Sequence, residues 1–153
     1  MWVPPEETDP VLLHAPTRKS IAVFGAVRPA DGRLVVVKSD VFNAETFLAF
    51  LKQLLRHRRR NRLMVVVTDN AQYHRAKALR GWLYEHRNAI RLDYLPPYSP
   101  ELNHIERVWK LTRRTSTHNR YFPELEQLVE AVFKQFAIWA KPNSILRRLC
   151  AII

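Results

Sequence analysis

Short, strongly apolar segments alternate with segments of helical periodicity along most of this chain, and that alternation limits the folds open to it. Residues 20–27 and 34–37 are apolar runs of strand length on either side of residues 29–32, which contain an Asp-Gly pair. Two such runs around an Asp-Gly turn predict an antiparallel hairpin.

After the hairpin, helices and strands follow one another in turn. Residues 63–68 have the composition of a strand buried on both faces of a sheet, and residues 90–95 predict the next strand. Apolar residues at helical spacing predict four helices: near 43–58, near 75–86, from 99 to 109 or 115, and from 123 to a break at 141–143. Asn43 and Ser99 are the predicted caps of the first and the third. This order predicts an α/β domain with a mixed sheet flanked by helices, in which right-handed crossovers make the later strands parallel.

The length of 153 residues and the hydrophobic content of 47% fit a single domain over residues 1–153. Residues 1–17 hold four of the ten prolines and predict an irregular arm, within which residues 11–13 are compatible with a short edge strand.

The charge of the chain is strongly unbalanced, with 25 Lys and Arg against 14 Asp and Glu and a formal net charge of +11. Such a surface attracts polyanions, of which nucleic acid is the commonest, although a merely basic protein has the same composition. Cys150 is the only cysteine, which excludes an internal disulfide and fits a reducing compartment. With no signal peptide and no apolar run long enough to cross a bilayer, we expect a cytoplasmic, nucleoid-associated protein without a membrane partner.

Asp69 directly follows the apolar run at 63–68. It is therefore expected at the carboxyl end of a buried strand, where open α/β sheets place their ligand-binding crevices. An Asp-Asn pair at such a place is also compatible with a turn or a helix cap.

Glu106 is the second carboxylate of interest. On a helical wheel of the segment after Ser99, Leu102, Ile105 and Trp109 form an apolar stripe, and Glu106 lies about 40° from Leu102, at its margin. A carboxylate at the margin of a buried face is costly unless it is compensated, and a metal ion compensates it. An ion pair with Lys110 at i+4 is the alternative.

Carboxylates are the ligands that Mg²⁺ and Mn²⁺ prefer. Two such ions about 3.5–4 Å apart stabilise the attacking and leaving oxygens of a phosphoryl displacement. Such a site commonly has three or more acidic side chains, and Asp69 and Glu106 supply two.

Three segments taken in order resemble one known family: residues 69–74 (DNAQYH), 95–103 (LPPYSPELN) and 105–109 (IERVW). They are similar to the catalytic domain of DDE transposases, in the bacterial insertion-sequence group related to mariner elements. The resemblance implies a ribonuclease-H-like fold and a metal-binding triad holding two Mg²⁺ or Mn²⁺ ions. It also makes Asp69 the second acid and Glu106 the third.

The family's first acid lies on a first, central strand upstream of a segment like residues 1–4. Near this point the sequence has only Glu6, Glu7 and Asp9, in the proline-rich arm. The first central strand is therefore expected to be missing, so that the hairpin pairs poorly with the strand at 63–68, or residues near Val11 or another chain fill the gap. Weak or absent catalysis by the chain alone is the corresponding expectation.

Several basic and aromatic residues are candidate DNA contacts. Arg58, Arg59 and Arg60 end a predicted helix, where a solvated helix end is the equally good alternative. The remaining candidates are Tyr98 in the loop before Glu106 and, on the same predicted helix as Glu106, Lys110, Arg113 and Arg114. His74 is interpreted as a local hydrogen-bonding residue and not as a ligand.

The leading hypothesis is a transposase catalytic domain that acts on transposon-end and target DNA, either as a homodimer or with an upstream transposase fragment. The alternative is a non-catalytic, basic DNA-binding or dimerisation module derived from a transposase.

Overall fold

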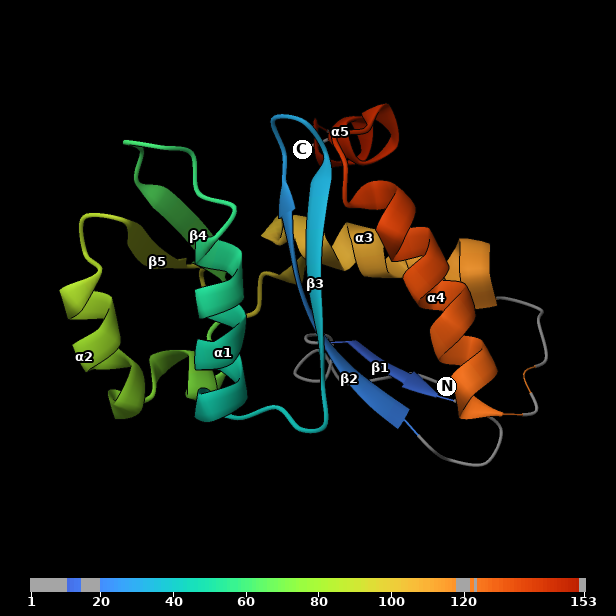
Figure 1. Ribbon diagram of the computed structural model, residues 1–153, viewed down its shortest axis with the longest axis horizontal. Coiled ribbons are helices and arrows are strands. Elements are labelled where there is room, and N and C mark those ends of the chain that lie inside the picture. The colour runs from blue at the N-terminus through green and yellow to red at the C-terminus, as the bar shows by residue number, and fades with distance from the viewer. Residues whose placement is uncertain (1–10, 15–19, 118–121, 123, 152–153) are drawn as a thin grey trace. The chain divides into compact units, whose positions relative to one another are not determined.

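The computed structural model describes residues 11–14, 20–117, 122 and 124–151 (Figure 1). These residues form two compact units. The first unit is Val41–Asn103, and the second unit consists of the described residues of Pro10–Asp40 and His104–Ile153. A single domain over residues 1–153 stays a prediction.

The first unit contains a two-stranded sheet of β4 (Met64–Thr68) and β5 (Ile90–Tyr94). The two strands are parallel, with Met64 opposite Ile90 and Thr68 opposite Tyr94, as the crossover pattern predicts. The helical elements of this unit are α1 (Ala44–Leu55), the 3₁₀ turns η2 (Gln72–Arg75) and η3 (Pro100–Leu102), and α2 (Lys77–Glu85).

The start of α1 confirms the cap predicted at Asn43. The Asn43 side chain accepts a hydrogen bond from Thr46 N–H at 2.9 Å, and Asn43 N–H donates to Thr46 Oγ1 at 3.0 Å. This reciprocal pair satisfies two backbone donors that a helix start leaves open. The helix buries Phe47, Phe50 and Leu51 and ends at Leu55, close to the predicted end near Arg58.

The expected burial of the 63–68 strand on both faces is wrong. Leu63, Val65 and Val67 are 42%, 43% and 54% exposed, whereas Thr68 is buried. Successive side chains of a strand point to opposite faces, so only the even-numbered face is covered. An uninterrupted apolar run does not reveal whether both faces of its sheet have a covering layer.

The second unit contains an antiparallel sheet in the order β1 (Val11–His14), β2 (Ser20–Arg28) and β3 (Arg33–Ser39). The hairpin β2–β3 is confirmed, with Arg28 opposite Arg33 at its turn. The edge strand considered near Val11 is also confirmed, inside the segment predicted as an irregular arm. The other residues of that arm lie outside the described residues.

The two ladders stay separate over the described residues: β1 pairs with β2, and β4 pairs with β5. Because the hairpin and the strand at 63–68 belong to different units, poor pairing between them stays a prediction. Residues 11–14 extend the hairpin, with Val11 opposite Val23.

The helices of the second unit are α3 (His104–Thr112), α4 (Leu125–Trp139) and α5 (Ser144–Ala151), with a π-helical turn, η4 (Arg113–Thr117), directly after α3. None of the helices in the described ranges has the length and apolar character that a membrane crossing requires.

The prediction of one helix starting at Ser99 is wrong. Ser99 Oγ donates to Pro97 O at 3.2 Å and makes no cap bond, and the 3₁₀ turn ends at Asn103, whose backbone is extended. The helix α3 therefore starts at His104, and Leu102 is 46% exposed instead of continuing the apolar stripe. The stripe that α3 buries is Ile105, Val108, Trp109 and Thr112.

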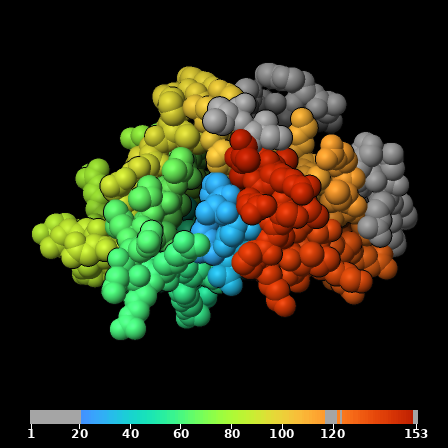
Figure 2. All heavy atoms as spheres, turned by 90° about the horizontal axis from the view of Figure 1, so that it is seen from above, coloured from blue at the N-terminus to red at the C-terminus, as the bar shows by residue number. Residues whose placement is uncertain are grey.

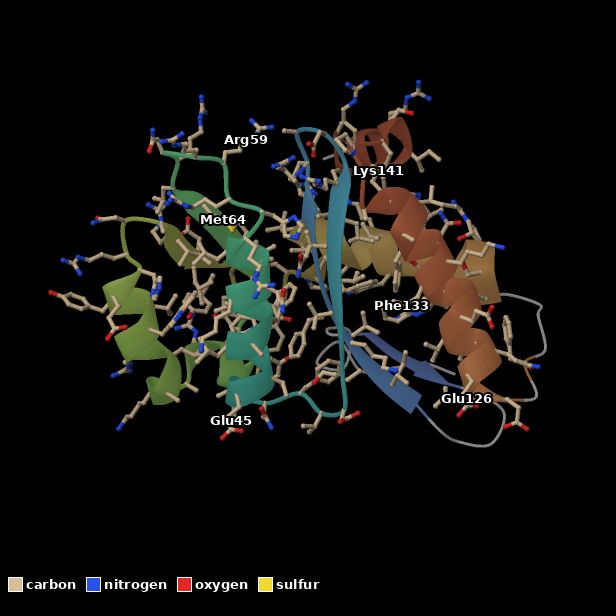
Figure 3. The ribbon with its side chains drawn as sticks, in the orientation of Figure 1. Glu45, Arg59, Met64, Glu126, Phe133 and Lys141 are labelled. Carbon is tan, nitrogen blue, oxygen red and sulfur yellow. The ribbon has the colours of Figure 1, made fainter. Side chains whose placement is uncertain are left out.

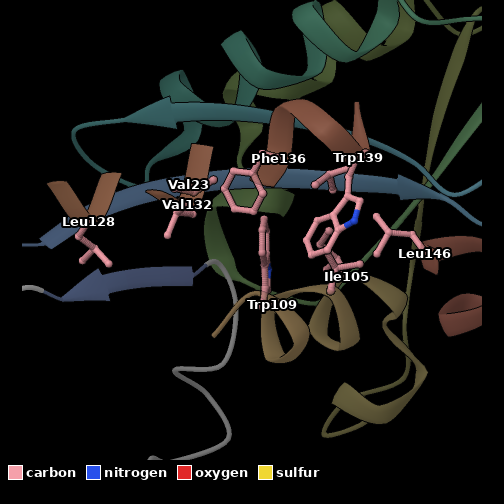
Figure 4. Packing of buried hydrophobic residues seen from close by; sticks show 10 residues of the cluster. Val23, Ile105, Trp109, Leu128, Val132, Phe136, Trp139 and Leu146 are labelled. Atoms are coloured by element: carbon pink, nitrogen blue, oxygen red, sulfur yellow. The ribbon is translucent and has the colours of Figure 1, made fainter. Parts of the chain in front are cut away.

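The core of the second unit forms where α3 and α4 pack on the hairpin (Figure 4). Trp109 is 1% exposed, and its ring meets Phe136 of α4 edge-on with centroids 5.9 Å apart. Gly25 of β2 lies beneath this indole, and a Cβ at Gly25 would stand 2.6 Å from Trp109 Cζ2. The missing side chain at Gly25 therefore makes room for Trp109.

Asn143 ties the start of α5 to the β2–β3 turn. Its backbone N–H donates to Asp31 O at 2.9 Å, its Nδ2 donates to Gly32 O at 2.8 Å, and its Oδ1 accepts from Leu146 N–H at 2.8 Å. In Figure 2 the tip of this turn, in light blue, lies against the red C-terminal part of the same unit.

We expect Gly25→Ala to lower the free energy of unfolding by about 1–3 kcal/mol, because the added methyl group overpacks against Trp109. Gly81→Ala is the matched control: a Cβ there meets nothing within 4 Å, so a gain of about 0.5–1 kcal/mol from helix propensity is expected. Urea denaturation measures both. Equal changes in the two variants would contradict the packing assigned to Trp109.

We expect Asn143→Ala to lower the free energy of unfolding by about 1–3 kcal/mol, since it removes a helix cap and leaves a carbonyl of the turn without its amide donor. Asn88→Ala, at an exposed residue after α2, is the control and should change little. Thermal unfolding followed by circular dichroism compares the two. An unchanged melting temperature for Asn143→Ala would rule out the tie between α5 and the hairpin turn.

Candidate metal centre

Asp69 stands at the carboxyl end of β4, as predicted. The pairing of β4 with β5 continues to this point, because Leu95 N–H donates to Thr68 O at 2.8 Å. The Asp69 side chain is 32% exposed, so it reaches solvent from a strand end whose last residue is buried.

Two nitrogen groups approach the same oxygen of the Asp69 carboxylate. Ala71 N–H donates to Asp69 Oδ1 at 3.0 Å, which closes an Asx turn. His74 Nδ1 lies 2.8 Å from the same Oδ1. The turn considered for the Asp-Asn pair is therefore present, whereas a helix cap is not, since η2 has Ala71 at its N-cap.

The loop that carries Asp69 is fastened to the end of β5. Asn70 Nδ2 donates to Leu95 O at 2.5 Å, and Asn70 Oδ1 accepts from Arg75. The Arg75 guanidinium lies 4.2 Å from the ring centroid of Tyr94, whose hydroxyl donates to His74 O at 2.7 Å. Burial raises the pKa of Tyr94 while Arg75 opposes the shift, so this phenol keeps its proton at neutral pH.

Sequence reasoning missed the roles of Thr68, Asn70, Arg75 and Tyr94 around Asp69. Asn70 belongs to the DNAQYH segment, so its place in that motif was the available signal. Arg75 and Tyr94 gave no comparable signal, because their contacts depend on how β5 and the loop fold together.

Glu106 lies in the first turn of α3, between the buried Ile105 and the half-buried Arg107. Its side chain is half-buried, and its oxygen Oε1 is fully buried. The margin position predicted from the wheel is thus found, although α3 starts later than the wheel assumed. Trp109, one helical turn further along α3, packs against Gly25 of the hairpin. This contact fixes the backbone of α3 that carries the Glu106 side chain.

The two carboxylates belong to different units, Asp69 to the first and Glu106 to the second. Their convergence on one metal site remains a prediction. Within the described ranges, no group of three or more His, Cys, Asp or Glu side chains is placed to hold an ion. Glu6, Glu7 and Asp9 lie outside the described residues.

Comparison with known proteins decides the family. The family described as DDE superfamily endonuclease matches residues 1–129 of the 153. The chain belongs to this DDE family. It is 31% identical over 108 residues to the insertion element IS630 uncharacterized 39 kDa protein of Shigella sonnei, a match that covers 71% of the chain and 31% of that relative. The chain thus spans about a third of the relative's length.

Solved structures show the fold that this DDE chain shares. The catalytic domain of the Mos1 mariner transposase superposes with a TM-score of 0.68 at 19% identity, over 92% of this chain and 72% of that one. The Mos1 mariner paired end complex with Mn gives a TM-score of 0.62 at 21% identity, over 86% and 40% of the two chains. The predicted α/β, ribonuclease-H-like fold is confirmed by this likeness.

The donor chemistry of this DDE chain fits a divalent cation at Asp69. The carboxylate offers hard oxygen donors, is partly open to solvent, and is oriented by N–H groups of its own loop. In the second unit, the Glu106 carboxylate on α3 is also a hard oxygen donor.

The residues expected to touch DNA belong to three segments, two of them basic and the third carrying Tyr98. Arg59 and Arg60 are exposed in the loop between α1 and β4, from which Arg59 projects in Figure 3. Arg58 is partly buried, and its guanidinium donates to Arg62 O at 2.8 Å. This bond bends the loop back on itself next to Asn61, which has a positive φ of 59°.

The second unit carries the other three basic candidates, Lys110, Arg113 and Arg114, all of them exposed. Arg113 and Arg114 lie in the π-helical turn η4 and not in the α-helix predicted for them. Tyr98, in the first unit, is 91% exposed with a positive φ of 56°, which turns its ring out of the loop before η3.

Proposed function

We propose that this DDE family member is the catalytic part of a transposase, with Asp69 and Glu106 as ligands of Mg²⁺ or Mn²⁺ and with DNA as the substrate. The observation that carries the proposal is the Asp69 carboxylate, which stands in a family motif at the end of a parallel strand. Two nitrogens of its own loop hold it in a fixed direction while it remains partly exposed.

In such a site, two divalent ions would supply an activated water and charge neutralisation at the reacting phosphate. Asp69 and Glu106 would hold them, and the fastened loop would keep the Asp69 carboxylate in place as DNA enters. Since the chain offers two convincing acids and such sites commonly have three, we propose that the chain alone cleaves weakly or not at all. A homodimer partner or an upstream transposase fragment would complete the site.

DNA as the partner is supported by the net charge of +11 and by the exposed cations of both units. Exposed arginines release counterions from DNA phosphates when they bind, which favours association at low salt. We propose phosphate contacts for Arg58, Arg59 and Arg60, and for Lys110, Arg113 and Arg114. Tyr98 is proposed to contact DNA through its exposed ring. A cytoplasmic, nucleoid-associated location follows from this proposal.

We expect Asp69→Asn and Glu106→Gln each to weaken Mn²⁺ binding by about tenfold or more, because each removes a charged oxygen donor. Asp93→Asn is the control: Asp93 is a 46% exposed carboxylate paired with Arg91, and its loss should leave the affinity unchanged. Electron paramagnetic resonance of free Mn²⁺ gives the affinities.

A plasmid-nicking assay accompanies this measurement, and any metal-dependent nicking by the wild-type chain should vanish in both variants. Nicking that persists in Asp69→Asn and Glu106→Gln would refute the metal site. Strong Asp69-dependent nicking by the wild-type chain would support the site and refute the expected inactivity.

A non-catalytic DNA-binding module remains the second candidate, and the exposed arginines of the α1–β4 loop favour it. The two functions differ in what they require: a module binds DNA equally well with or without divalent ions and after loss of both Asp69 and Glu106.

Replacing Arg58, Arg59 and Arg60 together by Gln should weaken DNA binding and make it less dependent on salt. In a plot of the logarithm of the DNA-binding constant against the logarithm of the salt concentration, the slope should become shallower by about 0.9 for each phosphate that the loop no longer neutralises. The control replaces Arg80, Arg87 and Arg91, which are exposed in the same unit, and so removes the same net charge elsewhere. Fluorescence anisotropy at several salt concentrations measures both slopes. Identical slopes for the two triple variants would mean that the loop acts only through net charge.

A further inference from the structure

His74 is a buried imidazole directed at the proposed metal ligand. Its side chain is only 4% exposed, and its Nδ1 lies 2.8 Å from Asp69 Oδ1. We propose that His74 is a positioning residue, whose Nδ1–H donates to Asp69 Oδ1 and sets the direction in which this carboxylate meets the metal ion. This inference rests on the proposed function of Asp69.

The neighbours of Nδ1 determine which ring nitrogen carries the proton. Besides Asp69 Oδ1, the nearest partners of Nδ1 are the backbone oxygen of Asp69 at 3.3 Å and Thr68 Oγ1 at 3.0 Å. A carboxylate oxygen and a carbonyl oxygen only accept hydrogen bonds. Since two of the three partners of Nδ1 only accept, and the Thr68 hydroxyl can also accept, we assign the ring proton to Nδ1, so that the imidazole holds the carboxylate through an N–H bond.

Three elements of the first unit hold the ring in this orientation. Phe47 of α1 packs on it with centroids 4.3 Å apart, and Tyr73 meets it edge-on at 4.4 Å. The backbone oxygen of His74 accepts the Tyr94 hydroxyl of β5 at 2.7 Å. A ring in contact with two aromatic side chains and tied through its backbone keeps one direction for its Nδ1–H bond.

The consequence for Asp69 lies in how its two oxygens are used. Oδ1 accepts from both Ala71 N–H and His74 Nδ1–H, and two such bonds fix the plane of the carboxylate. The position of Oδ2 then follows from the geometry of the group. Hydrogen bonds of this kind to a ligand carboxylate commonly change metal affinity by about 10- to 100-fold when they are removed.

The competing explanation is that His74 only fills space beneath α1. Asn and Gln separate the two explanations, because the side-chain amide of Asn falls near the Nδ1 position of His, whereas that of Gln falls near Nε2. Phe keeps the aromatic packing on Phe47 and has no donor. A positioning role therefore requires that Asn replaces His74 better than either Gln or Phe.

The experiment measures Mn²⁺ affinity by electron paramagnetic resonance in wild type, His74→Asn, His74→Gln and His74→Phe, each first tested for folding by circular dichroism. We expect His74→Asn to stay within about threefold of wild type, and His74→Gln and His74→Phe to bind about tenfold more weakly or worse. A folded His74→Phe or His74→Gln variant that binds Mn²⁺ as tightly as wild type overturns the proposal. A folded His74→Asn variant whose Mn²⁺ affinity is as low as that of His74→Gln or His74→Phe also overturns it.

Asp69→Asn distinguishes this failure from failure of the proposed function. If Asp69→Asn weakens Mn²⁺ binding and no folded His74 variant does, only the positioning role is wrong. If Asp69→Asn binds Mn²⁺ as tightly as wild type, or if wild type binds no Mn²⁺, both the metal site and the role of His74 are refuted.

Discussion

The hydrogen bond from Leu95 N–H to Thr68 O carries the pairing of β4 and β5 one step beyond the end of β5. The position of the loop that carries Asp69 depends on this extension. It brings the loop after β4 against the loop after β5, where Asn70 reaches Leu95 O and Arg75 stacks on Tyr94. The loop that carries Asp69 is thereby held at the carboxyl ends of both strands, which parallel pairing brings to one edge of the sheet.

The second unit fixes its carboxylate by a different means. Because Gly25 has no side chain, the Trp109 indole can lie against β2, and this contact anchors α3 on the hairpin. Glu106 stands three residues before Trp109, in the same short helix, and is therefore carried on a rigid element instead of a loop. Proposed ligands held by packing and by hydrogen bonds need little reorganisation when a metal ion binds, which favours affinity.

Much of this architecture could be predicted from the sequence, and the predictions that were wrong have identifiable physical causes. Asn43, the hairpin turn and the parallel strands follow from local chemistry and hydrophobic periodicity, so they were predicted correctly. The start of α3 was not, because Ser99 bonds back to Pro97 and the chain extends at Asn103 before the helix begins. Asp69 could be named from its motif, whereas the orientation of its carboxylate could not. That orientation depends on a buried His74 ring whose direction is set by Phe47 and Tyr94, residues far away in the chain.

The exposed face of β4 also has a consequence for how the chain behaves in concentrated solution. Residues 63–68 form an uncharged window of high β-propensity with three exposed apolar side chains, a composition that favours intermolecular strand stacking. Arg62 stands immediately before this window and Asp69 immediately after it. Charges at these two places act as gatekeepers against aggregation. The same Asp69 that is proposed to bind metal thus also places a charge beside this segment, so we expect its neutralisation to lower solubility separately from any effect on catalysis.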